Sequence, residues 1–145
     1  MLGDSMAETR IPSERYAAMA EELIEHEGWL TPIAHSDVRI AYLSSDAKKT
    51  SKGKTVFGQC EKVPDRYRWA IPYDFAIVIF EPNVTGFNES QLRTLMLHEL
   101  MHVGVFANED GDEVYKVVSP DVEDFCAILD RVGLDWAVPD GGDAA

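Results

Sequence analysis

Residues 75–104 read FAIVIFEPNVTGFNESQLRTLMLHELMHVG and carry the clearest structural signals in the chain. Residues 75–80 are all apolar and rich in β-branched side chains, which predicts a strand covered on both faces. Pro82, Asn83 and Gly86 then break the chain, and apolar residues recur further on at helical spacing. The stretch therefore predicts a buried strand followed closely by a helix.

The predicted helix begins with a nearly complete set of start signals. Asn88 is the expected N-cap, and Gln91 occupies the N3 position of a capping box. Phe87 and Leu92 stand at the two positions of a hydrophobic staple. Gly104 is placed to end the helix. Because apolar residues lie nearly all round it, we expect this helix to be mostly buried.

Upstream of this pair, the pattern predicts another helix and two strands. Residues 13–27 have apolar side chains at helical spacing, with Ser13 as N-cap and Gly28 after the last turn. Residues 38–42 begin with the alternation of a half-buried strand, and residues 55–60 are a second strand candidate.

Downstream, a hairpin and a third helix are predicted. Short apolar segments at 105–107 and 114–118 flank the acidic turn 108–113, whose Asp-Gly pair favours a hairpin over a calcium-binding loop. Ser119 and Pro120 are suited to the N-cap and N1 positions of the helix that follows.

The central helix carries the motif His98-Glu99-Leu100-Met101-His102. Histidines four residues apart project from one helix face and can hold one Zn²⁺ at about 2.0–2.1 Å each. Glu99 lies beside them and can take a proton from the activated water without binding the ion. The motif therefore predicts a catalytic zinc site with Glu99 as general base. The alternative is a pair of core histidines with polar partners and a surface glutamate.

A catalytic zinc site requires a third protein ligand as a rule. The two remaining histidines, His26 and His35, both precede the motif, so the downstream candidates are carboxylates. These are Glu109, Asp110, Asp112, Glu113, Asp121, Glu123 and Asp124.

Asp121 is the favoured third ligand. It falls in the first turn of the predicted third helix, which the hairpin can return against the motif helix. In the competing interpretation, Asp121 only complements the helix dipole and its free N–H groups. Asp124, one turn further on, is an alternative ligand or a partner that orients a histidine through its second ring nitrogen. Tyr115 and His35 are candidates for stabilising an oxyanion.

Length and composition limit the class of protein. A chain of 145 residues fits one domain, 1–145, with loose termini expected at 1–10 and 138–145. A net charge of −13 argues against nucleic acid as a partner. There is no membrane-length apolar run and no signal-peptide pattern, so we expect a cytoplasmic protein with Cys60 and Cys126 reduced.

Several segments resemble the phage metallopeptidase family, over about residues 38 to 136. They are 60–69, 73–77, 98–102, 121–125 and 131–136. The resemblance implies an α+β, zincin-like fold in which a small twisted, mostly antiparallel sheet packs against an N-terminal helix, the motif helix and a C-terminal helix. It also implies a hydrolase with His98 and His102 as metal ligands and Glu99 as the catalytic base.

Residues 121–125 also resemble gluzincin-like domains in which an acid four residues before a Phe is the third ligand, which indicates Asp121 again. In the phage family a His often precedes this Asp, whereas this chain has Pro120. If that His is the third metal ligand in relatives, the carboxylate of Asp121 must be the ligand in this chain.

The leading hypothesis is therefore a zinc-dependent peptidase that acts on a protein or peptide. The substrate would pair, as an added strand, with a sheet edge at residues 75–80 or a neighbouring strand. The alternative is a non-catalytic, zinc-binding interaction module of phage origin. Glu99 argues against it, because a structural zinc site needs no base. A third possibility, a DNA-repair protease of the SprT-like kind, conflicts with the net charge of −13.

Overall fold

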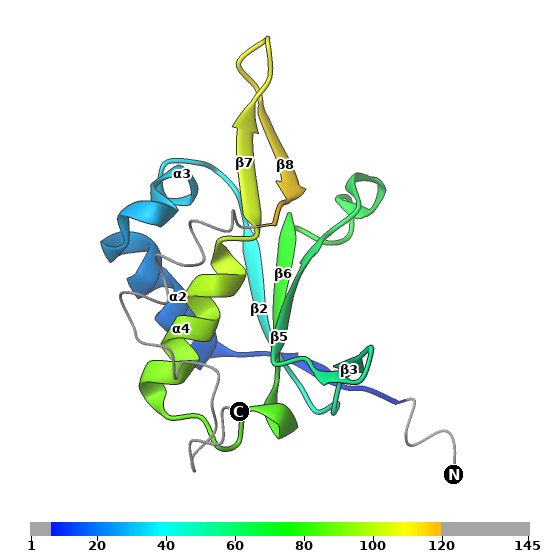
Figure 1. The fold of residues 1–145 in the computed structure, drawn as a ribbon. Helices are drawn as coiled ribbons and strands as arrows, with labels where there is room; N and C mark the ends of the chain where they lie inside the picture. The colour runs from blue at the N-terminus through cyan, green and yellow to red at the C-terminus, as the bar shows by residue number, and fades with distance from the viewer. Residues whose placement is uncertain (1–6, 120–145) are drawn as a thin grey trace.

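The computed structural model describes residues 7–119, and strand β6 (Phe75–Phe80) lies at the centre of its main sheet. β6 runs parallel to β2 (Ile40–Ser45) and antiparallel to β5 (Gly58–Lys62), and β1 (Arg10–Pro12) pairs antiparallel with the other side of β2 (Figure 1). The order β1-β2-β6-β5 makes a mixed sheet in which two of the three pairings are antiparallel. The α+β prediction is confirmed.

β6 has the bounds that the sequence predicts, and it is covered on both faces. Phe75, Ile77 and Ile79 belong to the core cluster on the helical side. Val78 and Phe80 alternate with them and are equally buried on the opposite side. Burial on both faces explains why this strand is apolar at every position, with only Ala76 partly exposed.

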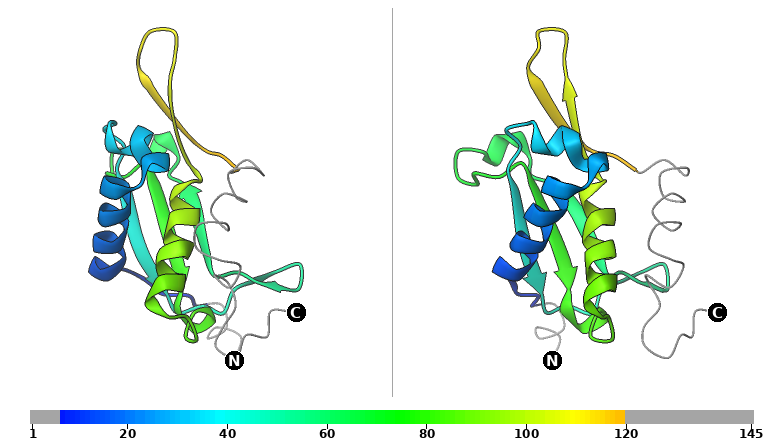
Figure 2. Two further views of the ribbon diagram at one scale, coloured as in Figure 1. Left: turned by 60° about the vertical axis from the view of Figure 1, so that its left-hand side comes forward. Right: turned by 90° about the vertical axis from the view of Figure 1, so that its left-hand side faces the viewer.

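Helices α2 (Glu14–His26) and α4 (Glu89–Leu100) lie side by side on one face of the sheet (Figure 2). Ser13 is the N-cap of α2, as predicted, and its side chain accepts a hydrogen bond from the Tyr16 amide. Four residues of α2 are buried against the core, Tyr16, Met19, Ala20 and Leu23.

Helix α4 begins as predicted, but the predicted end is wrong. The Asn88 side chain accepts a hydrogen bond from the Gln91 amide, and the Gln91 side chain accepts one from the Asn88 amide. The helix ends at Leu100 rather than near Gly104. The cause is strand pairing. β7 (Val103–Ala107) starts three residues after the helix ends and pairs in a hairpin, so Val103 and Gly104 belong to a strand instead of the helix.

Two predicted strand ranges also shift. The first strand runs from Ile40 to Ser45 instead of 38–42, because β1 pairs with residues 43–45 and extends it. The second runs from Gly58 to Lys62 rather than over 55–60. The remaining short elements are η1 (Gly28–Leu30), α3 (Thr31–Ala34), β3 (Thr50–Ser51), β4 (Lys54–Thr55), η2 (Asp65–Tyr67) and η3 (Glu81–Asn83).

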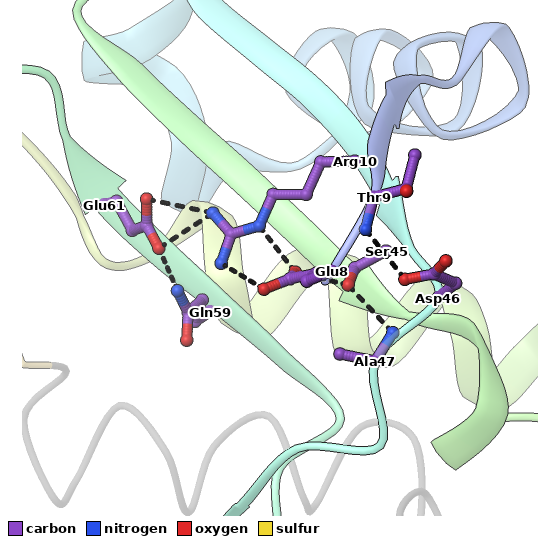
Figure 3. A network of polar contacts seen from close by, with 8 residues as sticks. All are labelled: Glu8, Thr9, Arg10, Ser45, Asp46, Ala47, Gln59 and Glu61. Carbon is purple, nitrogen blue, oxygen red and sulfur yellow. Dashed lines mark hydrogen bonds and ion pairs between the residues drawn. The ribbon is translucent and has the colours of Figure 1, made fainter. Parts of the chain in front are cut away.

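A polar network crosses the sheet face opposite the helices (Figure 3). Arg10 on β1 reaches Glu61 on β5, with Nη1 3.2 Å from Oε2, and its Nε donates to Glu8 at 2.6 Å. The Ser45 hydroxyl donates to the same Glu8 carboxylate. These contacts join the two edge strands of the sheet, so they help to fix the position of β5.

The predicted hairpin is confirmed as β7 and β8 (Glu113–Val117), which project beyond the body of the domain (Figure 1). Gly111 in the turn has a φ of 85°, a left-handed conformation that favours glycine. The Asn108 side chain accepts hydrogen bonds from the amides of Asp110 and Asp112. The acidic residues therefore form an exposed hairpin tip.

We expect Gly104→Ala to destabilise the protein by about 1–3 kcal/mol. A Cβ atom at this position would lie 2.6 Å from the Lys116 carbonyl oxygen and 2.8 Å from a Val118 methyl group. Urea unfolding measures the change, with Gly28→Ala as the matched control because no heavy atom lies within 4 Å of the Cβ it would add. Equal stability of the two variants would show that β7 and β8 do not pack this closely.

The predicted third helix, Cys126 and the C-terminal residues lie outside the described residues. Within residues 7–119, no helix has the length and apolar character needed to cross a membrane.

Candidate functional site

The end of helix α4 brings the two motif histidines together. His98 lies in the last turn of α4, and His102 lies in the turn that follows, with its amide donating to the Glu99 carbonyl. Their Nε2 atoms are 3.4 Å apart, and the ring planes are nearly perpendicular, at 86°. The structure therefore brings the two Nε2 atoms together, although His102 is not part of the helix as predicted.

The Val118 carbonyl fixes the orientation of His102. His102 Nδ1 lies 2.6 Å from this oxygen, which can only accept a hydrogen bond, so Nδ1 carries the proton. In return, the Val118 amide donates to the His102 carbonyl at 2.9 Å. The contact at Nδ1 directs Nε2 toward His98, and this hydrogen bond orients the ring as the outer partner of a metal-binding histidine does.

The distance between the two Nε2 atoms matches a shared metal ion. Two nitrogens bound to one ion at about 2.0–2.1 Å in tetrahedral geometry are separated by about 3.4 Å. The observed 3.4 Å is longer than the usual range for a direct hydrogen bond, about 2.7–3.2 Å. The separation is therefore compatible with one ion of zinc size between the two nitrogens.

The pKa of His98 is also suited to metal binding. Burial, together with the neighbouring His102, lowers the pKa of His98 to about 4. His98 is therefore neutral at physiological pH, and a neutral imidazole is the form that coordinates metal ions.

Glu99, which follows His98 in the chain, has a buried carboxyl group. Only 5% of the residue is exposed, and burial raises its pKa to about 7. A carboxyl group with a pKa near neutrality can both accept and return a proton under physiological conditions. Its Oε2 atom points toward Gly58, the first residue of edge strand β5, where a Cβ would lie 3.3 Å away.

Gly58 leaves the space that the Glu99 carboxylate occupies. A Cβ there would lie 3.1 Å from Ile79 Cδ1 and 3.2 Å from the Val78 carbonyl oxygen, in addition to the contact with Glu99. We therefore expect Gly58→Ala to displace the Glu99 side chain by a few tenths of an ångström. A crystal structure of the variant checks this, and an unmoved Glu99 would show that its position does not depend on this contact.

Among residues 7–119, no group of three His, Cys, Asp or Glu side chains is close enough to hold an ion, so no described residue joins His98 and His102 as a third ligand. The candidates Glu109, Asp110, Asp112 and Glu113 are exposed at or beside the hairpin tip. The remaining candidates Asp121, Glu123 and Asp124 lie outside the described residues.

Two other predicted residues take no part in the described cluster. His35 is exposed at the end of α3. The Tyr115 hydroxyl donates to the Glu113 carboxylate, and its ring packs at a steep angle against the Phe75 ring.

Cys60 faces the helical side from β5, where burial and the nearby Glu99 raise the pKa of its thiol to about 12. The thiol is therefore protonated at neutral pH.

An α+β domain with two adjoining histidines and a buried glutamate at the end of a core helix has side chains of the kind found in metal-dependent hydrolases. A family model described as "Putative phage metallopeptidase" matches residues 9–141, and the chain belongs to this family. No curated protein and no solved structure matches the chain.

Sequence reasoning missed two contributors to this cluster. The Val118 carbonyl is a backbone group, so no residue type could reveal it. Gly58 does leave a signal, since a glycine inside a strand pattern often marks the close approach of another group.

Proposed function

We propose that the protein is a zinc-dependent peptidase in which His98 and His102 bind the metal and Glu99 is the general base. The observation that carries this proposal is the 3.4 Å separation of the two Nε2 atoms, with the Val118 carbonyl fixing the ring of His102. The family, whose description names metallopeptidases, supports the same class of reaction.

Zinc held by these residues would activate a water molecule and polarise a substrate carbonyl group. Glu99 would accept the proton of the attacking water and deliver it to the leaving nitrogen. Burial supports this role, because a carboxyl group with a pKa of about 7 is a stronger base than an exposed glutamate. The proposal includes Asp121 as third ligand, with Asp124 as the alternative, on the resemblance of their segment to gluzincin-like domains.

The proposed substrate is an extended peptide paired with strand β5. Residues 75–80 or a neighbouring strand were the predicted edge; β6 lies inside the sheet, between β2 and β5, so the neighbouring strand is the candidate. Among residues 7–119, β5 pairs only with β6, so its outer edge offers free backbone groups. Gly58 on this strand faces Glu99, which would bring a peptide bound at the edge close to the base.

Hydrolysis of a pool of internally quenched random hexapeptides tests the proposed function. We expect cleavage by the purified protein, its loss after treatment with a strong chelator and its return when stoichiometric zinc is added. Cleavage that persists after complete metal removal would contradict a metal-dependent mechanism. The absence of any cleavage by zinc-loaded protein, on peptides and on unfolded proteins alike, would favour the non-catalytic, zinc-binding module.

A further inference from the structure

The segment between β5 and β6 is an unusual surface loop. Residues 64–73 are all exposed, and they include four of the eight large apolar side chains that are exposed among residues 7–119. Trp69 is 86% exposed, and the other three are Tyr67, Ile71 and Tyr73. We call residues 64–73 the aromatic loop.

The aromatic loop is held in place by its own hydrogen bonds. Turn bonds join the amides of Tyr67, Arg68 and Ile71 to carbonyls at positions 64, 65 and 67, at distances of 2.8–3.0 Å. The Arg68 guanidinium pairs with Asp74 at 2.6 Å, and Asp74 is only 1% exposed. Asp74 in turn accepts a hydrogen bond from the Arg39 amide at 2.9 Å. A buried carboxylate therefore anchors the loop to the sheet.

An anchored loop that presents aromatic side chains to water is poised for binding. Exposed large apolar groups that are already ordered lose little conformational entropy when a partner covers them. Trp, Tyr and Arg are the residues that dominate binding energy in protein interfaces. Arg66 stacks on the Tyr67 ring at 4.9 Å and has no ion pair among the described residues. Its guanidinium adds a positive charge beside the exposed rings.

The position of the aromatic loop indicates its occupant. The loop follows β5 directly, and Gly58 at the start of β5 faces Glu99. From Gly58 to Lys62 an extended chain advances roughly 13 Å. A peptide paired with β5 and cleaved near Glu99 would therefore reach the loop about four residues from the scissile bond.

We propose that the aromatic loop is a substrate-binding exosite for an unfolded protein substrate. It captures an extended apolar segment of the substrate, and the residues that flank this segment are acidic rather than basic. This inference rests on the proposed peptidase function. The aromatic rings would cover the apolar side chains, and Arg66 would favour acidic neighbours. A hexapeptide cleaved at its centre ends before the loop, so it serves as the matched short substrate.

The test compares kcat/KM for two substrates, dephosphorylated β-casein as an unfolded, apolar and acidic chain and the random hexapeptide pool. We expect Trp69→Ala to lower kcat/KM for casein by about tenfold while the value for the hexapeptide pool changes less than about twofold. Arg66→Glu should lower the casein value in the same selective way. Ile11→Ala is the control, because Ile11 is 56% exposed on β1, at the opposite edge of the sheet.

An unchanged casein value in both loop variants would overturn the exosite, and so would an equal fall for both substrates. If wild type cleaves neither substrate, the proposed peptidase function fails, and binding of fluorescein-labelled casein decides the inference by itself. Fluorescence anisotropy would then have to show casein binding that Trp69→Ala weakens. Casein binding that is absent, or that does not depend on Trp69, would overturn the loop as a binding surface.

Discussion

Replacing Glu99 with Gln is expected to lower the rate of peptide hydrolysis by a factor of about 10²–10⁴. Gln has nearly the same shape, but its amide cannot accept the proton of the attacking water. Because Glu99 is buried and burial raises its pKa to about 7, the neutral amide should be accommodated without loss of stability. Kinetics on zinc-loaded protein measure the effect.

Glu89→Gln is the matched control for this variant. Glu89 stands in the first turn of the same helix, where it is exposed and paired with Arg15 at 3.1 Å. This control should retain wild-type activity, and both variants should retain zinc. Full activity of Glu99→Gln would remove Glu99 from the proposed mechanism.

The second large effect concerns the link between zinc and stability. A ligand present at about 1,000 times its dissociation constant stabilises the native state by about 4 kcal/mol. We therefore expect added zinc to raise the Tm of the metal-free wild type by several degrees, and His98→Ala to abolish the increase. His98 is neutral and already aligned with His102, so little reorganisation opposes binding.

Thermal unfolding with and without zinc measures this link. His35→Ala is the control, since His35 is exposed at the end of α3, and it should keep the full zinc-dependent increase. An increase that survives in His98→Ala would place the stabilising ion elsewhere.

The sequence predicted those parts of the fold that depend on local signals. β6 was placed to the residue because an apolar run bounded by Asp74 and Glu81 has few alternatives. The start of α4 was found because its capping box involves neighbouring residues alone. The end of α4 was missed because pairing of β7 with β8 is a tertiary effect. β1 gave no signal, since it has only three residues and ends in a proline.

The site was predictable to a similar degree. The four-residue spacing of His98 and His102 indicated that the two rings would meet, because a single turn of backbone places them on one side. The contact from the Val118 carbonyl could not be predicted, since it depends on how the hairpin returns to the end of α4. The edge position of β5 likewise follows from strand order, which local patterns do not determine.

The most direct measurement is the zinc content of purified wild-type protein, His98→Ala and His102→Ala, determined by mass spectrometry without added metal. A site centred on the two facing Nε2 atoms predicts about one zinc per chain in the wild type and a nearly complete loss in both variants. Asp121→Ala belongs in the same series, because reduced zinc there would identify the third ligand. A wild type that holds no zinc, or variants that hold as much as the wild type, would contradict the zinc site on which the proposed function depends.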